Sequence, residues 1–406
     1  MWKALTVFFL CVPVAAQAFS QCTVTAIGGP GAEMAEEGSN PVAAGAWAYA
    51  GYTQGNKAVV VAASANGNVL GAPVTVSVGS GAARDIRLAA FANRVYAAWQ
   101  QHTTTGYHLM VAASHGYGAP GSWNAPVDLG QVLSDIAQIS ADGTDVHVVY
   151  LTTDGTATVS SSTNSGRSFG APVGLGASSG EVVIENDGRH VYAAFETGKL
   201  YVHRYVMLGV SPDRGATFTV TNVSDNGVRD AREPILTVNR TNGRLSLVWR
   251  ESRPVNAVYL QSLDHGQSWS TPLVVDVPAR QVMVQDDGDL VYVSYLKKFQ
   301  ISGVYDWQVY LALSRDGGLS FPSRRNLTGP TGISRLHGDD DRPIPWALSG
   351  KFRLTGIEAD GVHIWGGQSG HLRGSAFLGA GTLASPQGHV AAWQAPDGVV
   401  DYAFCN

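Results

Sequence analysis

A short phrase recurs about every fifty residues and constrains the fold more than any other feature of this chain. It reads Ser, any residue, Asp or Asn, any residue, Gly, any residue, Ser or Thr, and then an aromatic residue. Complete copies begin at Ser162, Ser211, Ser262 and Ser314, and degraded copies begin at Ser64 and Ser114. Successive copies start 48 to 52 residues apart. A period this regular indicates a repeated structural unit.

Pairs of strand-like runs precede each copy of the phrase. Residues 86–92 and 95–99 form one such pair, and residues 234–238 and 245–249 form another. Turn residues such as Asn-Gly and Asp-Gly separate the members of a pair, which is typical of β-hairpins. A third strand runs into the phrase and a fourth follows it. Four antiparallel strands per unit predict an all-β fold, a β-propeller of seven or eight four-stranded blades.

The first eighteen residues resemble an export signal. Lys3 gives a positive start, an apolar run follows from Ala4 to Val14, and Ala16-Gln17-Ala18 resembles a cleavage site. A buried first strand is the alternative. No later segment is long and apolar enough to cross a membrane. We therefore expect residues 19–406 to form a single propeller domain in a secreted or periplasmic protein.

Two cysteines, Cys22 and Cys405, lie at opposite ends of the chain that remains after Cys11 leaves with the signal. In an oxidising compartment they are candidates for a disulfide, and two free thiols are the alternative. Pairing requires the termini to meet. A strand at residues 23–27 would then complete the last blade and close the ring, which leaves no exposed edge strand.

Composition narrows the choice of partners. The net charge is −5 and only 15% of residues are charged, which argues against a nucleic-acid partner. No metal-type Cys/His cluster and no phosphate-binding glycine loop is found, so we expect no cofactor and no metal. The acidic run at residues 286–289 is expected to be a solvated hairpin turn. Nothing in the sequence indicates the oligomeric state.

The repeated phrase resembles the Asp-box, or BNR repeat, of bacterial sialidases and related secreted propellers. In that family the box is a structural turn between the third and fourth strands of a blade. The resemblance implies that its aromatic residue packs between sheets and that its glycine adopts a conformation closed to other residues. It assigns the same structural role to Asn164, Asp213, Asp264 and Asp316.

A sialidase also needs catalytic groups. Family members bind the substrate carboxylate with three arginines, the first within a Phe/Tyr-Arg-Ile-Pro motif near the mature N-terminus, and they use a Tyr/Glu pair and an Asp. This chain has residues 38–42, Gly-Ser-Asn-Pro-Val, where that motif is expected, and its first arginine is Arg84. The nearest similar segment is Asp-Arg-Pro-Ile-Pro at residues 341–345. The resemblance therefore implies the fold and leaves catalysis open.

Candidate site residues lie in the loops that enter the innermost strands, where propellers usually bind ligands. If the chain is an enzyme, its candidate catalytic residues are Arg84, Arg232, Glu233, Arg280, Tyr305 and Arg342. Guanidinium groups match an anionic ligand geometrically, although solvated ion pairs around the funnel mouth are the alternative. Trp307 and Trp346 fall off the register of the other tryptophans, so they are candidates for stacking on a glycan.

Three functions fit these observations. The first is a secreted carbohydrate-recognition module that binds a glycan or glycoconjugate, and it is favoured because the repeat is present while the arginine motif is missing. The second is an exo-sialidase-type glycoside hydrolase with a diverged arginine triad. The third is a protein-interaction scaffold, because the fold does not fix the function.

Overall fold

The computed structural model describes residues 22–28, 32–33, 42–44, 47–64, 71–199, 203–224, 230–252, 254–287, 289–301, 304–326, 344–348, 351–358, 361–368, 371–377, 382–385, 388–394 and 400–405. Side chains are described only between residues 32 and 326, with gaps. The regular elements in these ranges are all strands, which confirms the expected all-β class. Within the same ranges, no helix has the length and apolar character needed to span a membrane. The expected signal at residues 1–18 lies outside the described residues.

The described strands form seven sheets, and every pairing between them is antiparallel. The first half of the chain contributes two sheets. One contains β2 (Ala32–Glu33), β3 (Val42–Ala44), β4 (Trp47–Gln54), β5 (Lys57–Ser64) and β6 (Val74–Thr75). The other has seven strands: β7 (Ala83–Phe91), β8 (Arg94–Thr103), β9 (Gly106–Ser114), β10 (Val127–Asp142), β11 (Asp145–Thr152), β12 (Thr156–Ser162) and β13 (Val173–Ala177).

Three four-stranded sheets follow along the chain. The first contains β14 (Val182–Asp187), β15 (His190–Lys199), β16 (His203–Ser211) and β17 (Thr219–Asn222). The second contains β18 (Ala231–Asn239), β19 (Arg244–Ser252), β20 (Val255–Ser262) and β21 (Leu273–Asp276). The third contains β22 (Arg280–Asp287), β23 (Leu290–Ile301), β24 (Val304–Ser314) and β25 (Ser323–Asn326).

The last two sheets have four strands each. One contains β26 (Ile344–Leu348), β27 (Lys351–Glu358), β28 (Gly361–Gln368) and β29 (His371–Phe377). The other joins both ends of the chain: β30 (Thr382–Ser385), β31 (Gly388–Gln394) and β32 (Val400–Cys405) pair in that order, and β1 (Cys22–Gly28) pairs with β32. Cys22 and Cys405 are directly opposite in the β1–β32 ladder.

The strand β10 belongs to two four-stranded units at once. Its first part, including Val127 and Asp128, pairs with β9, and its second part, Ala137 to Asp142, pairs with β11. The register shifts between Val132 and Ala137, where the strand passes from one unit to the next. The seven-stranded sheet is therefore two four-stranded units that share one continuous strand.

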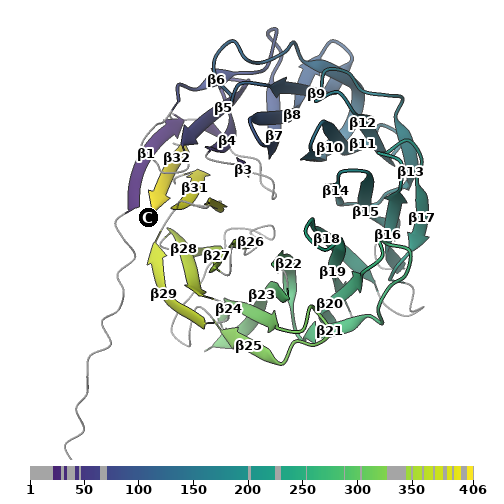
Figure 1. Cartoon of the computed structure of the whole chain (residues 1–406), viewed down its shortest axis with the longest axis vertical. Helices are drawn as coiled ribbons and strands as arrows, with labels where there is room; N and C mark the ends of the chain where they lie inside the picture. Colours follow the sequence, from purple (N-terminus) through teal and green to yellow (C-terminus); the bar gives the residue numbers. More distant parts are fainter. Residues whose placement is uncertain are drawn as a thin grey trace, which may run out of the picture.

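The sheets are arranged around a common centre, with β3, β7, β10, β14, β18, β22 and β26 nearest to it and β1 on the outer rim (Figure 1). The innermost strands contact one another in sequence: β3 with β7, β7 with β10, β10 with β14, β14 with β18, β18 with β22, β22 with β26, β26 with β30 and β30 with β3.

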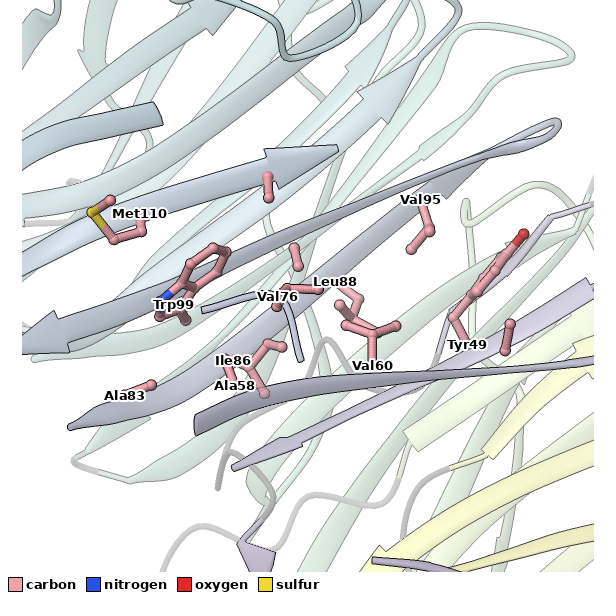
Figure 2. Packing of buried hydrophobic residues seen from close by; sticks show 13 residues of the cluster. Tyr49, Ala58, Val60, Val76, Ala83, Ile86, Leu88, Val95, Trp99 and Met110 are labelled. Carbon is pink, nitrogen blue, oxygen red and sulfur yellow. The ribbon is translucent and has the colours of Figure 1, made fainter. Parts of the chain in front are cut away.

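The core lies between neighbouring sheets rather than inside any one of them. Figure 2 shows one cluster in which Tyr49 and Val60 of β4 and β5 lie with Leu88 and Trp99 of β7 and β8. The second strands are covered on both faces, so nearly every residue of β8 from Val95 to Gln101 is buried. Burial at roughly 25 cal/mol per Å² of apolar surface makes these contacts the main force that holds adjacent sheets together.

The repeated phrase forms the turn between the third and fourth strands, as the resemblance implies. In the third complete copy, Asp264 Oδ1 accepts hydrogen bonds from the Ser262 hydroxyl and the Ser268 backbone N–H, each at 2.8 Å. The Ser262 hydroxyl oxygen accepts the Gly266 N–H at 2.8 Å, and Gly266 has a φ of 81°. The other complete copies repeat these bonds, with Asn164, Asp213 and Asp316 as the acceptors.

The aromatic residue of the phrase packs between sheets, which confirms a second expectation. The four aromatic side chains join clusters shared by adjacent units: Phe169, Phe218, Trp269 and Phe321. Hydrogen bonds from hydroxyl groups first, and from backbone N–H groups, lower the pKa of Asp213, Asp264 and Asp316 to about 2. The phrase is therefore a tightly bonded structural turn.

The acidic run at residues 286–289 is not a solvated turn throughout. The Asp286 side chain is fully buried and accepts from Arg244 Nε at 2.6 Å and Nη2 at 2.7 Å. It also accepts from the Asn239 amide at 2.6 Å. The expectation was wrong for Asp286 because β22 runs to Asp287, so Asp286 lies in the ladder rather than in the turn.

Candidate binding site at the bulged ends of the inner strands

Three innermost strands begin with the same local structure. The strands β7, β18 and β22 each carry an Ala-Arg pair at or just before their start: Ala83-Arg84, Ala231-Arg232 and Ala279-Arg280. The residue after the arginine has a positive φ in all three: Asp85 at 51°, Glu233 at 54° and Gln281 at 48°. The ladder register shifts at the same place in each strand. These are β-bulges, which re-aim side chains and are often found next to functional sites.

The bulges carry backbone strain. A left-handed conformation costs a residue with a side chain about 1–3 kcal/mol, and surrounding structure must hold it there. Such positions cluster at ligand-binding sites. The same β-bulge occurs in three strands, each time beside an arginine, which makes this end of the sheets the candidate site.

The bulged end is opposite to the end that carries the repeated phrase. Arg232 is opposite Arg250, close to the end of β19, whereas Ser262 of the phrase is opposite Leu245, close to its start. The candidate site and the structural turns are thus separated by the length of the strands.

Arg232 and Glu233 belong to a dense charged cluster. Arg232 Nη2 lies 2.7 Å from Asp230 Oδ2 and donates to the Ser252 hydroxyl at 2.8 Å. The Glu233 carboxylate accepts two hydrogen bonds from Arg250, one of them from Nε at 2.9 Å. The Arg232 side chain is 21% exposed, so its guanidinium group reaches solvent.

Glu196 of the neighbouring sheet completes this cluster. Its Oε1 accepts the Glu233 backbone N–H at 2.6 Å, and its Oε2 accepts from Arg204 Nη1 at 2.9 Å. Burial raises the pKa of Glu196 to about 7, helped by the carboxylates of Glu181 and Glu233 and opposed by the Glu233 N–H and by Arg204. Glu196 is therefore partly protonated at neutral pH, and it can donate a proton as well as accept one. We call Glu196, Arg204, Asp230, Arg232, Glu233 and Arg250 the carboxylate–arginine cluster.

Two other predicted arginines, Arg84 and Arg280, lie on other sheets. The Arg84 guanidinium lies 3.8 Å from the centre of the Tyr107 ring, and its Nε donates to Gln100 at 3.0 Å. Arg280 lies at the start of β22, opposite Leu296. The structure thus brings Arg232 and Glu233 together with residues that the sequence did not single out, and it places Arg84 and Arg280 at the same end of separate sheets.

For three predicted residues the structure describes only the backbone, and a fourth lies outside the described residues. Tyr305 and Trp307 lie on β24, opposite Gln300 and Lys298 of the long β23–β24 hairpin. Trp346 lies on β26, opposite Arg353. Arg342 lies outside the described residues.

A second polar group at the bulged end was missed from the sequence. Lys297 Nζ lies 2.6 Å from Asp276 Oδ2 and 4.8 Å from the centre of the Tyr310 ring. The Tyr295 hydroxyl donates to the same carboxylate. Burial first, and then Asp276, raises the pKa of Tyr295, which keeps its proton. This group is a second cluster of bonded polar side chains at the bulged end.

Potential metal ligands also occur among the described residues, in one group of three. Asp187, His190 and His265 each offer a ligand atom, and these atoms lie within 4.8 Å of one another. Asp187 and His190 flank the β14–β15 turn, so the group lies at the end opposite the bulges. The sequence expectation of no metal-type cluster missed it.

No protein-family model matches the chain, and no curated protein matches its sequence. Solved structures do match. The polysaccharide lyase Uly1 is 10% identical, with 82% of this chain and 92% of that chain covered and a TM-score of 0.50. The GH74 xyloglucanase from Xanthomonas campestris is 13% identical, with 92% of this chain and 59% of that chain covered and a TM-score of 0.51.

A sialidase from Trypanosoma rangeli also matches, at 9% identity and a TM-score of 0.42, with 94% of this chain and 58% of that chain covered. That TM-score is too low to carry an argument. At these identities the likenesses to the lyase and the xyloglucanase show the fold alone. The fold is that of a β-propeller.

Proposed function

We propose that the chain is a carbohydrate-recognition propeller that binds an anionic glycan at the bulged end of its inner strands. The observation that carries this proposal is the repetition of a strained bulge beside an arginine in β7, β18 and β22. Guanidinium groups match the carboxylate of an acidic sugar or a sulfate group in planar, bidentate geometry. The two matched structures are a polysaccharide lyase and a xyloglucanase, which supports a glycan as the ligand class.

The proposal includes the architecture. Eight four-stranded blades form a ring, with β10 shared by two of them, and β1 closes the ring by completing the blade of β30 to β32. The continuous contacts between innermost strands and the β1–β32 ladder support this closure. The blades carry Asp-box turns, and Cys22 and Cys405 form a disulfide in a protein exported by the signal at residues 1–18.

The direct register of Cys22 and Cys405 supports the disulfide. Residues directly opposite in an antiparallel ladder have Cα atoms about 4.5–5.5 Å apart, within the range that a disulfide spans. A bridge there holds the two chain ends together where the ring closes.

A binding assay tests the site. Wild-type protein, Arg232→Lys and Arg214→Lys are applied to an array of sialylated, uronate-containing, sulfated and neutral glycans. Arg232→Lys keeps the charge and loses the planar fork, while Arg214 is 56% exposed on a turn at the opposite end and serves as the matched control. We expect wild-type and Arg214→Lys to bind the same acidic glycans, and Arg232→Lys to bind them more weakly. Binding confined to neutral glycans, or equal binding by all three proteins, contradicts the proposal.

A glycoside hydrolase of exo-sialidase type is the second candidate, and the raised pKa of Glu196 favours it. A carboxyl group with a pKa of about 7 close to the arginine-bound Glu233 resembles the paired carboxyl groups of glycosidases. If the wild type releases the fluorophore from a fluorogenic sialoside and Glu196→Gln does not, the chain is this enzyme rather than a recognition module. Array binding without turnover excludes it, and silence in both assays favours a protein-interaction scaffold.

A further inference from the structure

A carboxylate and two imidazoles meet where the sheet of β14–β17 adjoins the sheet of β18–β21. Asp187 Oδ1 lies 3.2 Å from His190 Nδ1, and Asp187 Oδ2 lies 3.2 Å from His265 Nδ1. The two imidazole rings stack with centres 4.0 Å apart and an angle of 15° between their planes. His190 and His265 are separated in the chain by the whole of β15 to β20, so only the fold brings them together.

The backbone brings all three side chains together before any ion binds. Asp187 and His190 are paired at the closed end of the β14–β15 hairpin, whose turn contains Gly188 with a φ of 71°. His265 follows Asp264 in the repeated phrase and has a φ of 58°. A Cβ added to Gly243 would lie 2.9 Å from His265 Cε1, so the imidazole lies directly against the Gly243 backbone. Little conformational freedom remains to be lost on binding.

The spacing of the ligand atoms suits a small transition-metal ion. Zinc–nitrogen and zinc–oxygen bonds of about 2.0–2.1 Å in a tetrahedron place neighbouring ligand atoms about 3.3 Å apart. Each Nδ1 atom lies 3.2 Å from a different oxygen of Asp187, close to this edge length, and rotation of one of the two stacked imidazoles brings both Nδ1 atoms to a single ion. Two imidazoles and one carboxylate form a donor set that zinc accepts, whereas calcium and magnesium prefer six or more oxygen ligands or octahedral oxygen sites.

The surroundings supply an outer shell and an entry path. The Tyr192 hydroxyl donates to Asp187 Oδ2 at 3.0 Å. Hydrogen bonds of this kind orient a ligating carboxylate. The Asp187 side chain is 8% exposed, while that of His265 is 40% exposed, so an ion can enter from solvent and keep a water as its fourth ligand.

The equivalent positions in neighbouring sheets hold ordinary contacts instead. Arg214 replaces His265 in the preceding copy of the phrase and lies 3.4 Å from Asp145. Gly317 replaces it in the following copy and lies next to the Arg244 guanidinium. The fourth residue of the phrase therefore contacts the preceding sheet in all three copies. Of these three, only the copy at residues 262–269 makes the contact with an imidazole that meets a second imidazole and a carboxylate.

We propose that Asp187, His190 and His265 bind one Zn²⁺ ion, which joins the two sheets at the end opposite the carboxylate–arginine cluster. The ion replaces the hydrogen bonds between the imidazoles and Asp187 with coordinate bonds, and both Nδ1 atoms release any proton that they carry. The ion stabilises the fold and takes no part in glycan binding.

The test uses untagged mature protein treated with a chelator and then titrated with Zn²⁺ in a calorimeter. We expect saturable uptake of one equivalent and a melting temperature that rises with free Zn²⁺, because an ion that binds only the folded state stabilises it. Replacement of Zn²⁺ by Co²⁺ should give the intense visible absorption of a tetrahedral cobalt centre. Binding of Zn²⁺ by Tyr192→Phe should be at least about tenfold weaker, as is usual when an outer-shell partner is removed.

Two ligand variants separate metal binding from a structural role. His265→Arg copies the Arg214 arrangement, so it preserves a cation beside the acidic hairpin and removes a ligand; His190→Asn is the second variant. Both should fold, shown by an unchanged circular dichroism spectrum, and both should lose the Zn²⁺-dependent rise in melting temperature. His108→Arg is the control, because His108 contacts Asp128 at 2.9 Å at an exposed site with no second histidine. Absence of one-equivalent uptake in the wild-type protein, or equal uptake by both variants, overturns the proposal.

Discussion

Replacement of Glu196 by glutamine tests the electrostatics of the carboxylate–arginine cluster. The folded protein holds the pKa of Glu196 at about 7, against 4.5 for the ordinary side chain. The folded state therefore binds more protons than the unfolded state between these pH values. The stability that Glu196 contributes below pH 4.5 is therefore lost as the pH rises through about 7. Glutamine keeps one carbonyl oxygen, which replaces one of the two acceptors for Arg204 and the Glu233 N–H, and it does not titrate.

The magnitude follows from the size of the shift. A difference of about 2.5 pKa units at 1.36 kcal/mol per unit gives about 3 kcal/mol between pH 4 and pH 8. The side chain is 2% exposed, so solvent screens this energy little. We expect the free energy of unfolding of Glu196→Gln, minus that of the wild type, to increase by about this amount from pH 4 to pH 8. The expectation concerns this change and not the size of the difference at pH 4.

Urea unfolding followed by tryptophan fluorescence at half-unit pH steps measures this difference. Asp264→Asn is the control, because the pKa of Asp264 is lowered to about 2 and its contribution changes only in acid. The difference for that control should be flat above pH 5. A flat difference for Glu196→Gln between pH 4 and pH 8, or one that falls with pH, would refute the assignment of a protonated Glu196.

Other predictions concern stability. Asp286→Ala removes the buried carboxylate that accepts from Arg244 Nε and Nη2 and should cost about 3–5 kcal/mol in urea unfolding, while Asp286→Leu combined with Arg244→Met should cost less. Asp264→Asn should remove stability that the wild type has above about pH 4 and loses as the pH falls through about 2; identical acid unfolding midpoints would contradict this. Alkylation of denatured protein without reductant should label neither Cys22 nor Cys405, whereas labelling of both would exclude the disulfide.

The blade and its turn were predictable because they depend on local chemistry. A phrase that satisfies its own hydrogen bonds, as Asp264 does with Ser262 and Ser268, has the same geometry wherever it occurs. Turn residues and strand alternation are equally local, so the order of strands within a unit could be inferred. The pairing of the two chain ends was inferred instead from the two cysteines that flank residues 23–404, and the structure places Cys22 opposite Cys405.

The site was only partly predictable because burial depends on neighbouring sheets. Arg232 and Glu233 were recognised from their place before an inner strand. Glu196 ends an ordinary apolar strand in the sequence, and nothing there indicates that the Glu233 backbone from the next sheet covers it. Asp286 was misplaced for the same reason, since its partner Arg244 lies on another sheet.

The most direct measurement of where a glycan binds is hydrogen–deuterium exchange of the wild-type protein with and without the acidic glycan found on the array. Binding at the bulged end predicts slower exchange in peptides that contain residues 193–198 and 230–234, with no change in residues 262–269 at the opposite end. Two results would contradict binding at the carboxylate–arginine cluster. One is protection confined to residues 262–269. The other is that Arg232→Lys binds the glycan with the affinity of the wild type and shows the same protection at saturating glycan.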